Sequence, residues 1–445
     1  MKRFSLTTLS LALALGLSAG AVGAQSLGQL YESARAYDAT FLSAKAQFDA
    51  NVALADQAKA GLLPTIGFSG TVSRSDFNPT YGITGGERYF GTRSYGVTAT
   101  QALYRPGNLA TYNQGQKQLL IADAALQTAE QDLMVRLAQA YFDVLSSKDS
   151  LTLVKAQKAA VAEQLASAKR NFEVGTSTIT DTNEAQARFD LSRAQEIAAE
   201  NDLRVKQLAL NTLVGKPEVQ PFGIKAGAAL PALKGDDMNQ WVDASQQTHP
   251  SVRSAQMAVD VAVLENDKSR AGHKPTLDGF ISLNNSANIA GAVAGNATND
   301  SRYYLGQAGV TLTVPLFAGF ATQNRLKQTL ALEEKARVDL ENAKRTVAQA
   351  TRTAYFGVLS GISSVSAFEA AEKSSQSALD SNKLGYQVGV RINIDVLNAQ
   401  SQLYQTKKDL AAARYNVLLG QLKLRQANGS LKSEDLSSIT SVLAK

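Results

Sequence analysis

The chain has 445 residues, 44% of them hydrophobic, and a formal net charge of +6 at pH 7. This composition is that of a folded protein, and no run of lysine and arginine is long enough to predict nucleic-acid binding. With no cysteine and only two histidines, His249 and His273, the sequence predicts no disulfide, no metal site, no cofactor and no enzyme activity.

The first 24 residues have the pattern of a cleaved secretory signal. Lys2 and Arg3 form a short positive region, residues 6–17 are apolar but too few to span a bilayer, and small residues follow up to Ala24. Cleavage is expected after Ala24, and an N-terminal anchor helix is the alternative. No later segment reaches about 18 uncharged apolar residues, so no transmembrane helix is predicted after the signal.

The rest of the chain is an internal repeat. Residues 140–145 return as residues 354–359, 214 positions later, and residues 172–186 return as 386–400 with the same separation. Such self-similarity indicates that one structural unit has been duplicated. The predicted segments are a signal peptide (1–24), repeat one (25–214), a linker rich in glycine, proline and alanine (215–238), repeat two (239–428) and a polar C-terminal tail outside the helical rod (429–445).

Each copy opens with a helical stretch and continues into a β-hairpin. The helical stretches, 29–61 and 239–271, end at a glycine that is soon followed by proline, which is a typical helix stop. Apolar residues then alternate with small or polar ones, and this period of two predicts antiparallel hairpins at 65–101 and 276–314. In the first hairpin, a loop is expected at about 74–92.

A much longer helix follows each hairpin, from about residue 107 and about residue 320. In the first copy the apolar residues between Leu119 and Val144 step by three and four, which is the pattern of a coiled-coil seam. At 1.5 Å per residue, about 65 helical residues would reach roughly 100 Å. A helix of that length indicates a rod or tube rather than a compact domain.

A tight turn and a returning helix complete each copy. The long helices are expected to stop at Gly175 and Gly389, and the returning helices to cover about 181–214 and 395–428. Asp181, followed three residues later by a glutamate, fits the N-cap of the first returning helix. Each copy is therefore helix, β-hairpin, long helix, turn and helix.

Four strands are too few to close a membrane-spanning barrel, because every strand edge must be paired inside a bilayer. A dimer would supply eight strands and a trimer twelve, and single-chain barrels begin near eight. The alternative is a soluble four-stranded sheet at the end of a helical rod. Aromatic residues near the hairpins, including Tyr81, Tyr95 and Tyr304, favour the membrane interpretation, as does the signal peptide.

Several motifs resemble the TolC family of outer-membrane channels, in the same order and over nearly the whole chain after the signal. They are the strand-to-helix junctions at 103–107 and 315–319, the turn at 386–399, and the runs 413–416 and 426–429. The resemblance implies a mixed α/β membrane protein. It would be a homotrimer whose 12-stranded β-barrel in outer-membrane lipid continues into a 12-helix coiled-coil α-barrel in the periplasm.

The resemblance also implies the function of an exit duct for tripartite efflux or type I secretion. The expected partners are a periplasmic adaptor (membrane fusion protein) and an inner-membrane transporter of the RND, ABC or MFS type. The alternative function is that of a periplasmic coiled-coil structural or adaptor protein without a pore. The sequence does not identify the exported substrate.

By the same resemblance, Asp395 stands where the family has an acidic ring at the periplasmic constriction. Three carboxylates around a three-fold axis would attract cations. Many relatives carry a second acidic residue one turn later, where this chain has Asn398, so the strength of cation selectivity is open. The structural alternative for Asp395 is a first-turn carboxylate that complements the helix dipole.

Three further residues match family positions that hold the entrance closed: Asp181, Tyr386 and Arg391. Thr180 is a weaker candidate for the same latch. An Asp–Arg pair and a tyrosine hydroxyl could join neighbouring coiled coils, and an adaptor could break these contacts. The turns themselves are short and apolar. Gly175 and Gly389 are interpreted first as helix stops and second, together with Thr176 and Val390, as tips that face the adaptor.

Overall fold

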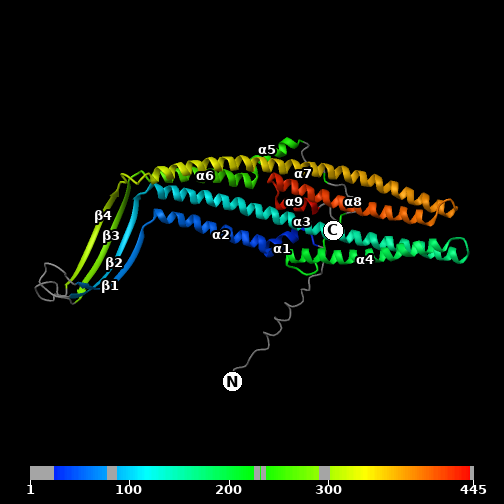
Figure 1. Cartoon of the computed structure of the whole chain (residues 1–445), viewed down its shortest axis with the longest axis horizontal. Coiled ribbons are helices and arrows are strands. Elements are labelled where there is room, and N and C mark those ends of the chain that lie inside the picture. Colours follow the sequence, from blue (N-terminus) through cyan, green and yellow to red (C-terminus); the bar gives the residue numbers. More distant parts are fainter. Residues whose placement is uncertain (1–24, 78–87, 225–230, 232–236, 290–300, 441–445) are drawn as a thin grey trace, which may run out of the picture. The chain divides into compact units, whose positions relative to one another are not determined.

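The computed structural model describes residues 25–77, 88–224, 231, 237–289 and 301–440 (Figure 1). The predicted signal peptide, Tyr81 and the end of the predicted tail lie outside these residues. The chain divides into two compact units. Unit one consists of residues 1–45, 126–252 and 344–445, and unit two of residues 46–125 and 253–343. Within the described ranges, no helix is both long and apolar enough to cross a membrane.

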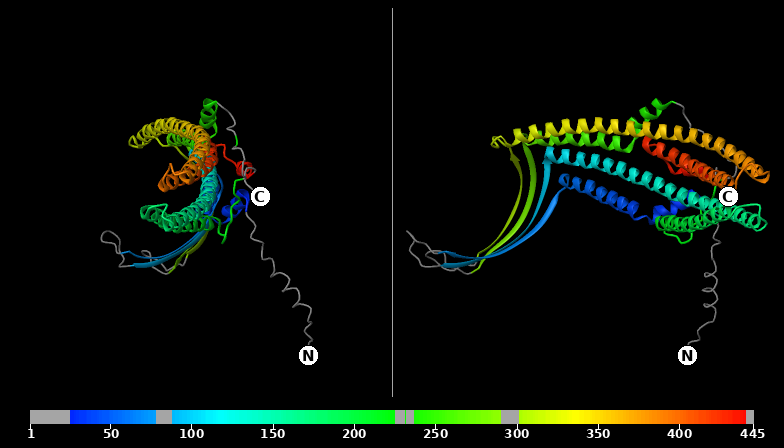
Figure 2. Two further views of the ribbon diagram at one scale, coloured as in Figure 1. Left: turned by 90° about the vertical axis from the view of Figure 1, so that its right-hand side faces the viewer. Right: turned by 45° about the vertical axis from the view of Figure 1, so that its right-hand side comes forward.

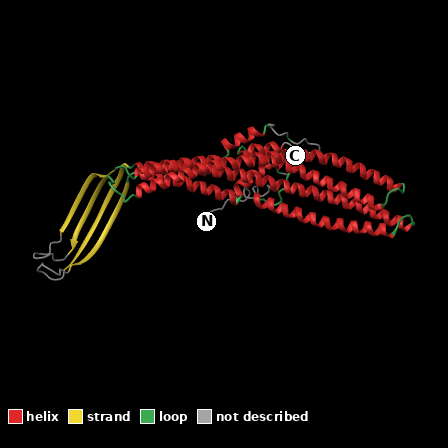
Figure 3. Ribbon diagram, turned by 45° about the horizontal axis from the view of Figure 1, so that its top comes forward, coloured by secondary structure: helices red, strands yellow, loops and turns green. Residues whose placement is uncertain are grey.

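Unit two contains one antiparallel sheet with the strand order β1-β2-β3-β4 (Figure 3). The strands are β1 (Thr65–Phe77), β2 (Arg88–Tyr104), β3 (Thr276–Ile289) and β4 (Ser301–Thr313). The two hairpins join through β2 and β3, where Val97 pairs with Leu283. The loop expected at 74–92 is wrong, because the ladder between β1 and β2 continues through Phe77 and Arg88. Glycine and polar residues hid the period-two pattern there.

The two faces of this sheet differ in polarity. One face carries large apolar side chains that are exposed, among them Ile66, Phe68, Val72, Val97, Ile281, Leu283, Val310 and Leu312. The other face lines a concave surface with hydroxyl and amide groups, including Thr98, Thr100, Ser282, Asn284 and Thr311. Soluble proteins rarely expose an apolar patch of this size to water. The apolar face of the sheet therefore indicates contact with lipid or with another protein surface.

Each opening helical stretch is broken, so the prediction of one continuous helical stretch over 29–61 is wrong. In repeat one, α1 (Leu27–Tyr37) and α2 (Ala39–Lys59) meet at Asp38, whose backbone is extended. In repeat two, α5 (Met238–Thr248) ends at His249 and α6 (Pro250–Ala271) begins at Pro250. Proline suits a first helical position because it has no N–H to donate. The residues His249 and Pro250 themselves predict a helix start within this stretch, and the start of α6 at Pro250 confirms it.

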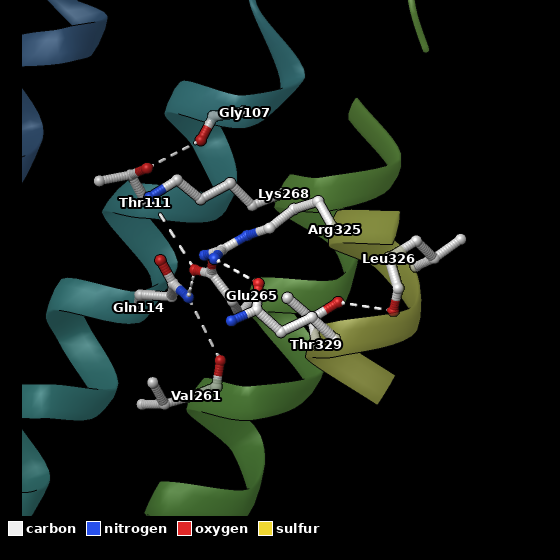
Figure 4. Close-up of polar contacts among 10 residues, drawn as sticks. Gly107, Thr111, Gln114, Val261, Glu265, Lys268, Arg325, Leu326 and Thr329 are labelled. Atoms are coloured by element: carbon white, nitrogen blue, oxygen red, sulfur yellow. Dashed lines mark hydrogen bonds and ion pairs between the residues drawn. The ribbon is translucent and has the colours of Figure 1, made fainter. Parts of the chain in front are cut away.

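Two long helices, α3 (Pro106–Glu173) and α7 (Ala321–Gln387), begin in unit two and continue into unit one. Within unit two, a polar layer joins their first turns to α6 (Figure 4). Glu265 of α6 accepts hydrogen bonds from Gln114 of α3 (2.9 Å) and from Arg325 of α7 (2.6 Å). Burial raises the pKa of Glu265, but these bonds outweigh burial and leave its pKa below the ordinary value. The charged carboxylate fixes the register of the three helices.

In unit one, two antiparallel helix pairs lie side by side, α3 with α4 (Ile179–Val214) and α7 with α8 (Asn393–Asn428) (Figure 2). Their main core contains buried side chains from several elements, such as Tyr31, Tyr141 and Leu418. The coiled-coil seam of α3 is buried here at Leu133, Leu137 and Val144.

The C-terminal segment belongs to this core. Residues 433–440 form α9 (Ser433–Thr440), and Leu431, Leu436 and Ile439 are buried in the main cluster of unit one. The prediction that this segment lies outside the helical body is therefore wrong. Two apolar residues three positions apart are enough to anchor one face of a short helix, although the segment as a whole is polar.

Asp38 is a buried carboxylate in unit one, and we expect it to make stability depend on acid. Its side chain pairs with Arg136 (2.9 Å) and accepts a hydrogen bond from the N–H of Phe41 (2.9 Å). The hydrogen bond from Arg136 lowers the pKa of Asp38 against the effect of burial. A lowered pKa stabilises the folded state above the unfolded value of about 3.9, and this stabilisation is lost as the pH falls through the folded pKa.

Asp38→Asn should therefore lower the free energy of unfolding by about 1–3 kcal/mol at neutral pH. The deficit should shrink below about pH 4, where the wild-type carboxylate becomes protonated as well. Thermal unfolding followed by circular dichroism between pH 7 and pH 3 measures both effects. A deficit that stayed constant over this range would show that the charge of Asp38 contributes nothing.

Candidate functional site

The turns at the tips of the two helix pairs are built by glycines in the left-handed conformation. Gly175 has φ of 75° and Gly389 has φ of 81°, which side chains other than glycine rarely adopt. Beyond them the chain bonds back to the ended helix: the N–H of Thr176 donates to the carbonyl of Asn171 (2.8 Å), and that of Val390 to Gly385 (2.9 Å). The predicted helix stops are confirmed, with α3 ending at Glu173 and α7 at Gln387.

Thr178, not Asp181, is the N-cap of α4. The Thr178 hydroxyl accepts from the N–H of Asp181 (3.2 Å), and Oδ2 of Asp181 accepts from the N–H (2.9 Å) and hydroxyl (2.8 Å) of Thr178. The expected N-cap role of Asp181 is wrong, because the helix begins one turn earlier and places this residue at its third position. Thr180, the weaker latch candidate, is exposed in the same turn.

Asp395 occupies the matching third position of α8. Its Oδ2 accepts a long hydrogen bond from the N–H of Ile392 (3.4 Å), so the carboxylate lies at the positive end of the helix. Arg391 approaches the same oxygen (Nη1 to Oδ2, 3.7 Å). Within one chain Arg391 therefore pairs with Asp395 and not with Asp181. Both side chains are partly exposed.

Tyr386 and Asn398 contact residues that the sequence did not single out. The Tyr386 hydroxyl accepts a hydrogen bond from Asn171 of α3 (3.1 Å), and Oδ1 of Asn398 accepts one from Arg188 of α4 (2.9 Å). Each contact joins the α7–α8 pair to the α3–α4 pair. No pattern in the chain marks Asn171 or Arg188, because such partners are set by how the helices pack.

The tips also present apolar side chains to their surroundings. Val174 is 73% exposed, Val388 65%, Val390 76% and Ile392 60%. Four exposed β-branched residues around two turns are unusual for a surface that meets only water. Among the described residues no group of acidic, histidine or cysteine side chains could hold a metal ion. Charged and apolar contacts are what this site offers.

The sequence model of the family described as "Outer membrane efflux protein" matches the chain twice, over residues 30–216 and 241–430. The chain belongs to this family. A curated relative, "Outer membrane protein TolC" of Vibrio cholerae, is 34% identical and aligns over 97% of this chain and 96% of its own length. "Alkaline protease secretion protein AprF" of Pseudomonas aeruginosa is 30% identical over 92% of this chain and 85% of its own.

A likeness of fold agrees with this membership. The solved structure of CusC has a TM-score of 0.76 to this chain at 17% identity, and the match covers 92% of this chain and 93% of that one. At this identity the match supports the fold alone. Membership of the outer membrane efflux protein family makes this chain an outer-membrane export channel, and the resemblance noted in the sequence is confirmed.

Proposed function

We propose that this protein works as a homotrimer, in which three copies of the sheet close a 12-stranded barrel in outer-membrane lipid. Within the described residues β1 and β4 each pair with one strand, so each copy has two edges that need partners. A bilayer does not tolerate unpaired edges, and pairing β1 with β4 of the next copy would remove all of them. The exposed apolar face supports this proposal, since it would lie against lipid.

The α3–α4 and α7–α8 pairs of three copies would form a 12-helix duct in the periplasm. The cargo would enter it from an inner-membrane transporter of the RND, ABC or MFS type through a periplasmic adaptor. The relatives named for TolC and for secretion of alkaline protease support both efflux and type I secretion as uses of such a duct. The exposed valines of the tips would provide apolar contact area for the adaptor.

The tips would also be the gate. In the proposed trimer three Asp395 carboxylates form a ring that concentrates cations, with Asn398 one turn further along. Arg391 and Tyr386, with Asp181 and Thr180 of a neighbouring copy, would hold the ring narrow until the adaptor breaks these contacts. The single observation that carries the export function is the match of the family to both copies of the repeat.

Electrophoresis and bilayer recordings on the purified mature protein test this proposal. A trimeric channel should migrate as a trimer unless heated, fractionate with the outer membrane, and give small, stable openings in a planar lipid bilayer. A well-folded oligomer that never inserts would overturn the barrel. The periplasmic adaptor function would then become the better interpretation.

A further inference from the structure

Asn393 is a wholly buried polar side chain at the tip of unit one. It is the first residue of α8 and has an exposed fraction of 0%. Its Oδ1 accepts a hydrogen bond from Nε2 of Gln164 on α3, and its Nδ2 donates to the main-chain carbonyl of Asp181 on α4 (3.4 Å). One carboxamide thus connects the start of α8 to both helices of the other pair.

The first copy of the internal repeat lacks this amide. The equivalent residue in the first copy, 214 positions earlier, is Ile179, and it is likewise the first residue of its helix. Ile179 is 52% exposed. Burial of apolar surface favours isoleucine inside and asparagine outside, and the tips show the reverse. The buried amide of the second copy is therefore unusual, and it contributes hydrogen bonds rather than apolar contact.

The surroundings of Asn393 make its hydrogen bonds hard to replace. A cluster of buried apolar residues from the same three helices packs next to it: Val161, Leu165, Ala168, Ala185 and Leu397. Water does not compete for the amide in such a place, and a separated amide would be left without a partner. Near the tips, two further polar contacts between the helix pairs, Tyr386 with Asn171 and Asn398 with Arg188, involve half-buried or exposed side chains.

We propose that Asn393 is a positioning residue of the gate, which holds α8 against α3 and α4 within one copy while the entrance is closed. This inference rests on the proposed function, since it needs the α7–α8 pair to move relative to the α3–α4 pair. The contact differs from a latch between copies because all its atoms come from one chain. An adaptor that releases only the contacts between copies would leave this restraint in place.

Single-channel recordings of Asn393→Leu test the proposal. Leucine keeps the size of the side chain and removes both hydrogen bonds. We expect the ratio of open to closed channels to rise roughly fivefold, which is the effect of losing one net hydrogen bond, because the bond to the Asp181 carbonyl is long (3.4 Å) and adds little. Gln164→Leu, which removes the donor from α3, should give a similar rise. The double variant should not exceed Asn393→Leu, because the bond that Gln164→Leu removes is already absent there.

A matched control is Asn382→Leu on α7, whose amide bonds to the carbonyl of Ala378 in its own helix (2.9 Å). Its open ratio should equal that of the wild type. The temperature at which the trimer dissociates reports a purely structural defect, which would lower that temperature without raising the open ratio.

Equal open ratios in the wild type and Asn393→Leu would overturn the inference and leave the channel function standing. Should Asn393→Leu fail to assemble, Gln164→Leu decides alone, because its half-buried side chain makes less demand on packing. A wild-type protein that does not conduct would overturn the channel function and, with it, this inference.

Discussion

Arg391→Ala should give a channel that conducts more than the wild type and that lanthanum(III) blocks at a lower concentration. The two effects have separate causes. Conductance rises because, in the proposed trimer, Arg391 contributes to the contacts that keep the entrance narrow. Block becomes stronger because Arg391 lies 3.7 Å from the Asp395 carboxylate and offsets part of its charge. Exposed ion pairs contribute about 0.2–1 kcal/mol, so block should occur at roughly two- to fivefold lower concentration.

The conservative variant Arg391→Lys separates these causes. Lysine keeps the positive charge beside Asp395 but not the planar, forked donor group of arginine. Block should then stay near the wild-type concentration while conductance rises. Tyr386→Phe, which removes the hydroxyl that accepts from Asn171 (3.1 Å), should also raise conductance and leave block unchanged. If Arg391→Ala and Tyr386→Phe both conduct like the wild type, neither residue holds the entrance closed.

Asp395→Ala should weaken block by lanthanum(III) by roughly ten- to a hundredfold. In the proposed trimer three carboxylates would face one cation, and each unit charge at about 4 Å contributes on the order of 1 kcal/mol in water. Titrating the block in single-channel recordings measures the change. Arg391→Ala should strengthen the block by lanthanum(III), whereas Asp395→Ala should weaken it. Because the two expected changes have opposite signs, the two variants together test whether the charge of Asp395 binds the cation.

Asp395 also stabilises the start of α8, so a control variant must keep this structural contribution while it removes the charge. Its carboxylate, in the first turn of α8, accepts a long hydrogen bond from the N–H of Ile392, and losing it should destabilise the helix by about 0.3–1 kcal/mol. Asp395→Asn keeps a hydrogen-bond acceptor there and removes only the charge. Both variants should lose block to a similar degree. Block that persists in Asp395→Asn would remove this residue from the pore ring.

The sequence predicted the order and type of the main elements because their signals extend over many residues. Few structures are compatible with a repeat at constant separation, with apolar seams at helical spacing and with a glycine after each long helix. The break at Asp38 and the extra length of β1 and β2 were not predicted, because each depends on one or two residues. At the start of α4, both Thr178 and Asp181 are followed by an acidic residue three positions on, so pattern alone did not choose the cap.

The candidate site was predicted as positions but not as contacts. Gly175, Gly389 and the acidic residues at the start of α4 and α8 follow from the repeat and the turn chemistry. The pairing of Arg391 with Asp395, and the roles of Asn171 and Arg188, depend on how four helices pack together. Asn393 had no signal at all, since asparagine near a helix start is ordinary and only its burial makes it unusual.

The difference between the two tips has an evolutionary consequence. In a ring made of identical hairpins, the same residues would have to support the wall and allow opening. Any mutation would then change every hairpin of the ring. Here the gene carries two versions of the hairpin. One has Ser177 and Ile179 where the other has Arg391 and Asn393. If the tips gate the proposed trimer, mutations in one version could change how readily the pore opens, while the other version keeps its structure.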